Sequence, residues 1–389
     1  MKVGFISFHS FSNPGGVKNH ILGLSAEFSK RGIENKIIAP RRNPDEDYGK
    51  KIILLGTSFP FPFGGSEADL CVNFNPIAIE EVLDREKFDV LHFHNLSVPS
   101  AWQIMLSRSA KKSLNILTFH SNVSGSELIR TFPEFLYPVR KMVDWKMDGI
   151  IGVSPLILKY FKGFKKPTVV IPNGVDVSYF SPERFNDKKL MGAANPNIFT
   201  PGRKDKINIL FLGRMEDRKG LIYLLRAFKK LCGNYSNLLL TVVGDGPMEE
   251  ECRNFAKENS LDNVIFKGRA PEDQAPFYYN DCDIYCSPAI YGESFGIVLI
   301  EAMAAGKPVV AFGIDGYTSV LGKGSGKKFL AEAKNVSDLA EKLEMFIKDE
   351  KLRQKMGKWG MEEVQKYDWP KIADQVLAFY DRCSKFKNI

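Results

Sequence analysis

The chain has 389 residues, of which 44% are hydrophobic and 26% charged, a composition typical of soluble globular proteins and a length that favours two domains. No apolar stretch approaches the ~20 residues needed to cross a bilayer, so we expect no membrane-spanning helix. The formal net charge of +8 favours anionic partners such as nucleotides or phospholipid head groups, and without zinc-finger spacing or an RNA-binding aromatic motif, nucleic acid is the weaker interpretation.

The first residues, MKVGFISF, form a strand-like run that leads into a glycine-bearing loop. They lack the small-residue cleavage site of a secretory signal, so we expect a cytoplasmic protein that could associate with the inner face of the plasma membrane. Six cysteines are scattered along the chain without metal-ligand spacing, which favours buried, reduced thiols. They are Cys71, Cys232, Cys252, Cys282, Cys286 and Cys383.

Short apolar runs alternate with segments of helical character through the first half of the chain. This alternation predicts a parallel sheet covered on both faces, and hence an α/β fold. The strands expected here are residues 2–8, 36–40, 89–94, 115–120 and 149–154.

A polar, Asn/Pro/Gly-rich interval at 182–206 interrupts the alternation, which then restarts. Two such sheets in tandem predict two Rossmann-like domains with ligand loops at the carboxyl ends of their strands. We expect domains at 1–188 and 205–366, and a C-terminal helix at 367–389, opened by Pro370, that could cross back to the N-terminal domain. The strands expected in the second half are residues 207–213, 238–244, 263–268, 282–288 and 307–313.

The loop after the first strand, residues 9–20, carries Gly15 and Gly16 ahead of a helix. Glycines let backbone N–H groups approach a ligand, and a helix start favours an anion. The G-x-G-x-x-G spacing of an ordinary dinucleotide site is absent. Taken alone, the loop is equally consistent with a plain turn between a strand and a helix.

The segment GRMEDRKG, residues 213–220, follows the first strand of the second half and precedes a helix. Arg214 and Lys219 would flank an anion at that strand end, each with a charge-assisted bond of about 1.5 to 3 kcal/mol. Two such bonds would hold a diphosphate and offset the charge that grows on it when it leaves. A solvated basic loop is the alternative.

Glu293 and Glu301 lie eight positions apart in ESFGIVLIEAMAAG. On one helix with a rise of ~1.5 Å per residue they would be ~12 Å apart, whereas the carboxylates of glycoside hydrolases lie ~5 to 9.5 Å apart. A simple hydrolytic pair is therefore disfavoured. With Glu293 in the loop before the helix and Glu301 nearly two turns inside it, they could contact opposite ends of one ligand whose diphosphate rests on the helix start at 295–298.

All the histidines lie in the first half of the chain. His92 and His94 share a strand face without a carboxylate-rich metal pattern around them, so packed or hydrogen-bonded histidines are favoured over metal ligands. His120 ends a predicted strand at the presumed cleft, where it could meet a substrate, and a satisfied polar residue is the alternative. The five are His9, His20, His92, His94 and His120.

Residues 130–166 interleave lysine and arginine with aromatic side chains. That mixture suits the surface of an anionic membrane, although core helices with solvated lysine faces explain such a segment more often. The segment SFPFPFGG at 58–65 is either an apolar acceptor loop or a buried connection.

Six motifs, in order, resemble those of the GT-B glycosyltransferases of family 4: PGGV with His20, TFH ending at His120, IPNGVD at 171–176, GRMEDRKG, VVGDGP at 242–247 and ESFGIVLIEAMAAGKPVV. The likeness runs from about residue 1 to 381, and the motifs are specific when taken jointly. Within the family the chain looks most like the phosphatidylinositol mannosyltransferases, especially at SFSNPGGV, DVLHFH and YDW.

The resemblance implies two Rossmann-like domains facing a central cleft. It also implies a retaining, metal-independent transfer of a hexose from a nucleotide sugar, with GDP-mannose as the leading donor and no cofactor. The acceptor would be lipid-linked or a glycan, such as a phosphatidylinositol-type lipid. Retention in the family is described as front-face attack assisted by the leaving phosphate, and positive groups around the departing diphosphate would supply most of the catalysis.

Residue roles carry over by motif. The implied catalytic residues are His120, Glu293, Arg214 and Lys219, with Glu293 also meeting the sugar, Glu301 the ribose and His120 the sugar near the reacting carbon. The implied donor contacts are Gly16, Arg214, Lys219, Arg269, Ala270, Glu293, Phe295, Gly296, Ile297, Val298 and Glu301, and the implied acceptor contacts are His9, Asn13 and Lys18.

Two departures weaken the lipid assignment. The helix that is basic and meets the membrane in those mannosyltransferases is acidic here, IAIEEVLDREKF at 77–88, and we expect it to repel anionic lipid. Asp69 stands about where the relatives carry an arginine for the acceptor head group, and Lys18 replaces a neutral residue. Either the acceptor differs or the phosphate contacts have moved to Lys18.

Three alternatives remain open at this point. The nearest is the same chemistry with a UDP-sugar of the UDP-glucose type, because the loop GRAPE at 268–272 is too short to identify the nucleobase. A nucleotide-sugar 2-epimerase would share the architecture. A catalytically silent sugar-binding protein is disfavoured because Arg214, Lys219, Glu293 and His120 are all present.

Overall fold

A computed structural model of the chain describes residues 1–12, 15–63, 66–96, 99–122, 136–186, 203 and 205–387. The chain forms two compact units. Unit 1 comprises Met1–Gly174 and Trp369–Ile389, and unit 2 comprises Val175–Asp368. Each unit is built on its own sheet.

The first boundary between the units lies earlier than the interval 182–206 and the expected domain end at 188. The segment after Gly174 packs on helix α11 (Ala275–Asp281) of unit 2: the ring of Phe180 lies 5.7 Å from that of Tyr279. The ring of Phe185 lies 5.1 Å from that of Phe277. Residues 175–186, which were expected in the first domain, therefore belong to unit 2. The C-terminal helix, from Trp369, belongs to unit 1.

Unit 1 contains an eight-stranded sheet among its described residues, in the order β4-β3-β2-β1-β5-β6-β7-β8. All neighbouring strands are parallel except β3 and β4. The strands are β1 (Lys2–Ser7), β2 (Glu34–Arg41), β3 (Ile52–Phe63), β4 (Ser66–Val72), β5 (Val90–His94), β6 (Leu114–Phe119), β7 (Gly149–Gly152) and β8 (Thr168–Val170). The helices are α1 (Gly16–Lys30), α2 (Pro76–Glu86), α3 (Ser100–Leu106), α5 (Leu136–Lys146), α6 (Pro155–Leu158) and α16 (Trp369–Lys387).

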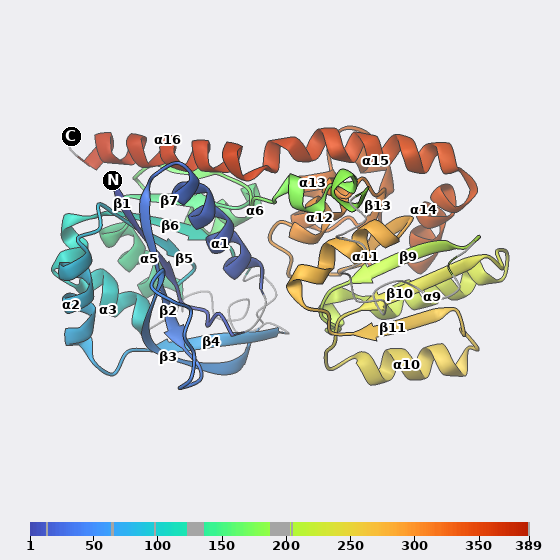
Figure 1. The fold of residues 1–389 in the computed structure, drawn as a ribbon, viewed down its shortest axis with the longest axis horizontal. Coiled ribbons are helices and arrows are strands. Elements are labelled where there is room, and N and C mark those ends of the chain that lie inside the picture. The colour runs from blue at the N-terminus through green and yellow to red at the C-terminus, as the bar shows by residue number, and fades with distance from the viewer. Residues whose placement is uncertain are drawn as a thin grey trace. The chain divides into compact units, whose positions relative to one another are not determined.

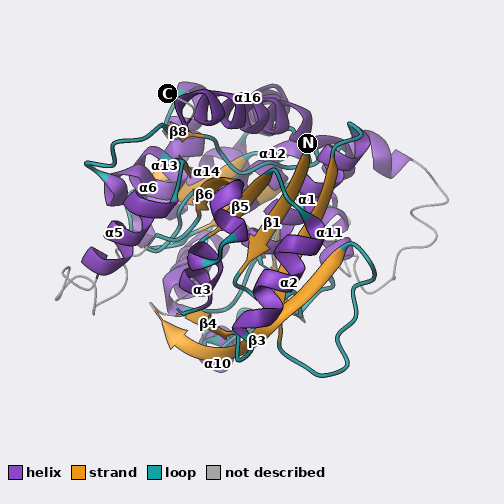
Figure 2. Cartoon of the chain, turned by 90° about the vertical axis from the view of Figure 1, so that its left-hand side faces the viewer, coloured by secondary structure: helices purple, strands orange, loops and turns teal. Residues whose placement is uncertain are grey.

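Helices cover both faces of this sheet (Figure 2). Because successive residues of a strand point to opposite faces, Phe5 packs in one apolar cluster and Ile6 in the other. The first cluster is completed by α1 and α16, which lie side by side in Figure 1. The second is completed by α2, α3 and α5. The parallel, two-sided sheet predicted from the apolar runs is confirmed.

Unit 2 contains a six-stranded parallel sheet in the order β11-β10-β9-β12-β13-β14. The strands are β9 (Ile207–Leu212), β10 (Leu238–Val243), β11 (Val264–Gly268), β12 (Ile284–Ser287), β13 (Val309–Phe312) and β14 (Leu330–Ala331). The helices are α7 (Val177–Phe180), α9 (Leu221–Cys232), α10 (Glu249–Glu258), α11 (Ala275–Asp281), α12 (Ile297–Ala304), α13 (Asp315–Leu321), α14 (Val336–Lys348) and α15 (Glu350–Val364). All ten strands expected from the sequence are present within a few residues of their expected bounds.

Residues 58–63 form a strand where a loop or a connection was expected from the sequence, and Gly64 and Gly65 lie outside the described residues. Through Phe63 the chain continues β3, which pairs with β4 in an antiparallel hairpin. Pro60 and Pro62 disguise the strand because proline donates no ladder hydrogen bond. They are tolerated because the pairing of β3 with β2 ends at Thr57, which leaves β4 as the neighbour of the proline-bearing part.

Trp369, the first residue of α16, fills a slot lined by glycines. A Cβ atom at Gly23 of α1 would lie 2.2 Å from two atoms of its indole, and one at Gly174 would lie 2.5 Å from two others. The ring of His20 lies 5.4 Å from the indole on the same side of α1. Only glycine at these two positions leaves room for the ring, so α16 is fixed to unit 1 from its first turn.

We therefore expect Gly23→Ala to destabilise unit 1, although alanine favours a helix by ~1 kcal/mol over glycine. The overlap with Trp369 should cost more than that gain, for a net loss of about 1 to 2 kcal/mol. Thermal unfolding of the full chain measures it. The matched control is Gly233→Ala, where φ is −64° and the new Cβ would meet only a carbonyl oxygen at 3.4 Å; equal melting temperatures for both variants would contradict the packing argument.

Candidate functional site

The loop between β9 and α9 and the loop before α12 are held together in unit 2. The amide N–H of Ile290 donates to the carbonyl of Arg218 over 2.8 Å. Gly220 has φ 68°, and a Cβ there would lie 2.1 Å from the carbonyl oxygen of Pro288. The close backbone approach brings the cations of GRMEDRKG to the glutamate that opens ESFGIVLIEAMAAG.

Glu293 is clamped by two of those cations. Lys219 Nζ lies 2.7 Å from Glu293 Oε1, and Arg218 Nη1 lies 2.8 Å from the same oxygen. Burial alone would raise the pKa of Glu293, but the charges of Lys219 and Arg218 outweigh it and lower the pKa below its usual value. Glu293 is therefore an ionised carboxylate whose charge is already compensated.

A second buried carboxylate extends the cluster. Arg218 Nε lies 2.7 Å from Glu216 Oε2, and Arg214 Nε lies 3.2 Å from Glu216 Oε1. Both are ion pairs by distance. The cluster of Arg214, Glu216, Arg218, Lys219 and Glu293, here called the cation cluster, holds three cations and two carboxylates. These five residues alone sum to one positive charge, with the exposed Asp217 of the same loop outside the cluster. The Arg214 side chain is 51% exposed, so its charge is accessible to an anion.

The start of α12 lies next to the cation cluster in the sequence and is shaped by Gly296. Its φ is 106°, and a Cβ there would meet the ring of Tyr317 at 2.7 Å. The side chain of Phe295 is buried and packs on Tyr367, with ring centroids 5.4 Å apart. Phe295 can therefore offer a ligand only its backbone, whereas Ile297 and Val298 remain partly accessible at the helix start.

Glu301 lies on α12 as its fifth residue, just over one turn from the start rather than nearly two, because the helix begins at Ile297. The hydroxyl of Tyr279 donates to Glu301 Oε2 over 2.8 Å. Burial raises the pKa of Glu301 to about 7. At neutral pH this group exchanges readily between a hydrogen-bond donor and an acceptor, unlike Glu293.

Arg269 and Ala270 follow β11 at its carboxyl end, and Arg269 is exposed while Ala270 is partly buried. Like Arg214, they lie in a loop after a strand of the unit 2 sheet. Within the described residues, neither Arg269 nor Ala270 forms a hydrogen bond or an ion pair with the cation cluster. Their expected role in donor binding therefore stays a prediction.

In unit 1, Asp69 on β4 ties together the loops that follow β1 and β2. It accepts from the backbone N–H of Ser10 (3.2 Å) and from Ser58 Oγ (2.6 Å), and it pairs with Arg42. His9 Nδ1 lies 3.4 Å from it. Burial alone would raise the pKa of Asp69, but these partners lower it to about 2. The carboxylate is thus neutralised internally and does not present a bare negative charge to an acceptor.

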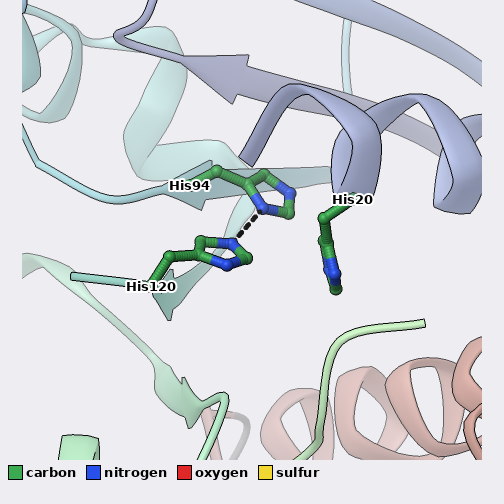
Figure 3. A group of neighbouring side chains, drawn as sticks. All are labelled: His20, His94 and His120. Carbon is green, nitrogen blue, oxygen red and sulfur yellow. Dashed lines mark hydrogen bonds between the residues drawn. The ribbon is translucent and has the colours of Figure 1, made fainter. Parts of the chain in front are cut away.

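His120 follows β6 and is buried beside two other histidines (Figure 3). Its backbone N–H donates to Asn95 Oδ1 over 2.7 Å, and its Nε2 lies 3.1 Å from His94 Nδ1. The ring of His20, on α1, lies 4.8 Å from that of His120. Burial lowers the pKa of His120 well below its usual value, so a neutral imidazole stands at this position.

His92 behaves as the packed histidine that was favoured from the sequence. Its Nδ1 lies 2.6 Å from the hydroxyl of Tyr380 on α16, and its Nε2 lies 2.6 Å from Thr118 Oγ1. Both ring nitrogens are used inside the fold. His92 therefore anchors α16 and is excluded from the candidate site.

The glycine loop of unit 1 is only partly described. Gly16 is the first residue of α1, where it is exposed, and Lys18 is half-buried in the first turn. Asn13 lies outside the described residues. Gly16 belongs to unit 1, while Arg214 and Lys219 belong to unit 2, so the expectation that all three hold one diphosphate stays a prediction.

The acidic helix α2 is less repulsive than its sequence indicates. Glu80 accepts from the backbone N–H groups of Arg108 and Ser109, and Asp84 from the hydroxyl of Ser109. Glu86 is buried between Lys2 and Lys36 at 2.9 Å each. Most of its carboxylates are thus used to hold unit 1 together. Across the described ranges, no helix combines the length and the apolar content that a membrane crossing requires.

Comparison with known proteins identifies the family. Residues 14–179 match the family model described as Glycosyltransferase Family 4, and residues 197–362 match that of Glycosyl transferases group 1. The chain is 32% identical over 388 residues to the phosphatidyl-myo-inositol mannosyltransferase of Mycobacterium leprae, covering 98% of this chain and 96% of the relative. The chain belongs to glycosyltransferase family 4. It is also 31% identical to the mannosyltransferase of the same name from Mycolicibacterium smegmatis, over 99% of this chain and 94% of that protein.

The fold of this glycosyltransferase is shared by other proteins of known structure. Sucrose-phosphate synthase from Thermosynechococcus elongatus superimposes with a TM-score of 0.76 at 21% identity, covering 98% of both chains. HepE from Anabaena, in complex with UDP and glucose, superimposes with a TM-score of 0.74 at 17% identity, covering 98% of this chain and 99% of that one. The expected GT-B fold of two Rossmann-like domains is confirmed.

Sequence reasoning missed Arg218 and Glu216, although both stand inside GRMEDRKG. The loop contains three cations, Arg214, Arg218 and Lys219, and the sequence does not indicate which of them pairs with both carboxylates of the cation cluster. The available signal was the pair of carboxylates, Glu216 and Asp217, between Arg214 and Arg218, because a carboxylate in such a loop needs partners if it is buried.

The raised pKa of Glu301 makes the stability of this glycosyltransferase depend on pH. The folded chain keeps the proton to about pH 7 while the unfolded chain releases it near the ordinary value of 4.5, so this stabilisation is complete below 4.5 and is lost as the pH rises through 7. Glu301→Gln cannot ionise, and its unfolding free energy should fall less than that of the parent between about pH 5 and about pH 7.5. Urea unfolding at both pH values measures this.

The control for that measurement is Glu341→Gln, since Glu341 is an exposed glutamate on α14. Its pH profile should match that of the parent protein. A Glu301→Gln profile parallel to the parent's would show that Glu301 ionises normally in the folded chain.

Proposed function

We propose that this family 4 member is a retaining, metal-independent hexosyltransferase that moves mannose from GDP-mannose to a lipid-linked or glycan acceptor, with a phosphatidylinositol-type lipid as the leading candidate. The observation that carries the chemistry is the surplus positive charge of the cation cluster at the strand end of unit 2. The choice of mannose and of a lipid rests on the full-length likeness to proteins named phosphatidyl-myo-inositol mannosyltransferases.

The cation cluster supports the role of diphosphate anchor. Arg214 is half-exposed and Lys219 is held beside it through Glu293, Arg218 and Glu216. A fixed array of charges needs little reorganisation as negative charge grows on a leaving group. In this proposal the array, with the N–H groups at the start of α12, stabilises the GDP that departs.

The state of Glu293 supports a retaining reaction without an enzyme nucleophile. A carboxylate that already shares one oxygen between Lys219 and Arg218 is a weak nucleophile. In the proposed reaction the acceptor oxygen attacks the anomeric carbon on the face from which the diphosphate leaves, and the acceptor proton passes to a phosphate oxygen. Glu293 then orients the sugar, Glu301 binds the ribose, and His120 contacts the sugar near the reacting carbon.

The acceptor side of the proposal rests on unit 1. Because Asp69 is neutralised by Arg42, the position that carries an arginine in the resemblance is neither positive nor repulsive here. A phosphate-bearing head group would then be bound by Lys18, with His9 and Asn13 contacting its hydroxyls. A UDP-sugar donor remains the second candidate, because a protein of the same fold was solved with UDP and glucose.

A donor panel tests the proposal. Calorimetry in the presence of EDTA would measure binding of GDP-mannose, UDP-glucose and UDP-N-acetylglucosamine, followed by mass spectrometry of products formed on phosphatidylinositol vesicles. Binding of GDP-mannose and an α-linked mannosyl lipid are expected. UDP-sugar binding alone would favour the second candidate, a 2-epimerised sugar without acceptor would favour an epimerase, and no binding to any donor would overturn the proposal.

Lys219→Ala should weaken donor binding and lower kcat/KM together, by about 10- to 150-fold, which corresponds to the loss of one charge-assisted bond of about 1.5 to 3 kcal/mol. Arg218 stays beside Glu293 in this variant, so the fold should be kept. The matched control is Lys229→Ala, an exposed lysine of α9 whose Nζ donates to Asn259. Unchanged donor affinity in Lys219→Ala would remove Lys219 from the diphosphate site.

Helix α5 supports peripheral contact with an anionic membrane. Tyr137 and Trp145 are 59% and 65% exposed, so the interpretation of core packing is wrong for these two rings, although Phe161 nearby is buried. Lys141 Nζ lies 4.8 Å from the ring centroid of Tyr137, and Lys146 Nζ lies 3.7 Å from that of Trp145. Exposed aromatic rings beside lysines are typical of a helix that lies in a membrane interface.

We expect the double variant Tyr137→Gln and Trp145→Gln to lower cosedimentation with vesicles containing anionic phospholipid by at least about tenfold, because aromatic rings supply most of the apolar area that such a helix buries. The control is Leu106→Gln, which removes another exposed apolar side chain from unit 1, on α3. Binding of the double variant equal to that of the parent protein would eliminate α5 as the membrane face.

A further inference from the structure

Three histidines converge inside unit 1 from distant parts of the chain. His20 comes from α1, His94 ends β5 and His120 follows β6, and all three are buried. Figure 3 shows the ring of His20 facing the pair formed by His94 and His120. Neither the cation cluster nor the anchor made by His92 uses these rings together.

The group of His20, His94 and His120 contains buried polar atoms without hydrogen-bond partners in the described part of the chain. They are His20 Nδ1 and His94 Nε2, and the side chain of Asn173 lies within hydrogen-bonding reach of both His20 and His120. Buried polar atoms in folded proteins are almost always paired, and an exception calls for a ligand, an ion or a water. Two such nitrogens, on histidines whose ring centroids lie 5.4 Å apart, point to a binding site between these rings.

The spacing of the ring nitrogens fits a metal ion after a small movement. One nitrogen from each histidine lies within 4.8 Å of the other two, so one point lies within about 2.8 Å of all three, against ~2.0 to 2.1 Å for a zinc–nitrogen bond. Rotations of the rings that move each nitrogen by less than about 1 Å would close the difference. Three imidazoles and one open position form a common zinc ligand set.

We propose that His20, His94 and His120 bind a divalent transition-metal ion of the zinc class, and that the bound ion inhibits sugar transfer. Imidazole nitrogens favour zinc and its neighbours, whereas magnesium and calcium require oxygen ligands. Binding replaces the hydrogen bond between His94 and His120 with two metal bonds, and the proton of that hydrogen bond moves to the other nitrogen of its own ring, so both imidazoles stay neutral. The fourth position is left for water.

Inhibition follows because the ion occupies a ring nitrogen of His120. In the proposed function that ring contacts the sugar near the reacting carbon, and a ring fixed on a metal no longer offers the same nitrogen. The inhibition rests on the proposed function, whereas the binding of the ion does not. The site is separate from catalysis, which is proposed to need no metal.

The test uses untagged, full-length protein freed of metal with a chelator. Zinc is titrated against a chromophoric indicator, and cobalt is added in a parallel sample, where a tetrahedral nitrogen site gives a visible absorption band. We expect one ion per chain. His20→Gln and His94→Gln should each weaken zinc binding at least about 100-fold, more than the loss of an outer-shell partner. His9→Gln, which removes a histidine outside the cluster, should bind zinc as the parent does.

Folding and activity are separated from binding in this design. If a variant unfolds, the site is judged by whether zinc raises the melting temperature of the parent protein and a chelator reverses the rise. Equal zinc affinity in all three variants, or no binding and no stabilisation at micromolar zinc, would overturn the site. Zinc binding with undiminished sugar transfer would overturn the proposed inhibition but not the metal site. Failure of every donor to bind would overturn the proposed function and would leave the metal site unaffected.

Discussion

The pairing of Arg218 with the buried Glu216 and the partly buried Glu293 is the interaction on which the proposed donor site depends. A buried charge is tolerated only when it is paired, and this guanidinium lies 2.7 Å from Glu216 and 2.8 Å from Glu293. With Arg218 ion-paired in this way, Lys219 shares Glu293 with it and Arg214 shares Glu216 with it. One surplus positive charge then faces solvent from a rigid base, where a flexible basic loop would have offered only mobile side chains.

Unit 1 carries the whole formal surplus of positive charge, with 26 basic and 18 acidic residues against 28 of each in unit 2, but its buried carboxylates are paired internally. Asp69 is neutralised by Arg42, Glu86 by Lys2 and Lys36, and the histidines at the ends of β5 and β6 are uncharged. The cation cluster of unit 2 is thus a local concentration of positive charge in a unit that is neutral overall, while the buried groups of unit 1 at these positions are neutral or paired. This division agrees with a donor that carries the phosphates and an acceptor that contributes a hydroxyl.

The sequence predicted the sheets well and the side-chain partners poorly. Apolar runs identify parallel strands because these are buried on both faces. Pro60 and Pro62 concealed β3, because the part of β3 that carries them pairs with β4 and no longer with β2, and can therefore contain proline. In the candidate site, Glu293 and Lys219 were expected to share a ligand, and the structure shows that they bind each other. His20, His94 and His120 converge only through the strand order of unit 1, which no local pattern encodes.

The assignment of Trp369–Lys387 to unit 1 has a consequence for synthesis on the ribosome. Unit 2 is an insertion between Gly174 and Trp369, so the first 174 residues emerge without the helix that supplies Ile372, Val376 and Phe379 to their core. At ~5 to 20 residues per second, the gap lasts roughly 10 to 40 seconds. During that interval the apolar side of α1 and the slot for Trp369 are uncovered, and a nascent chain arrested there is a natural client for a chaperone.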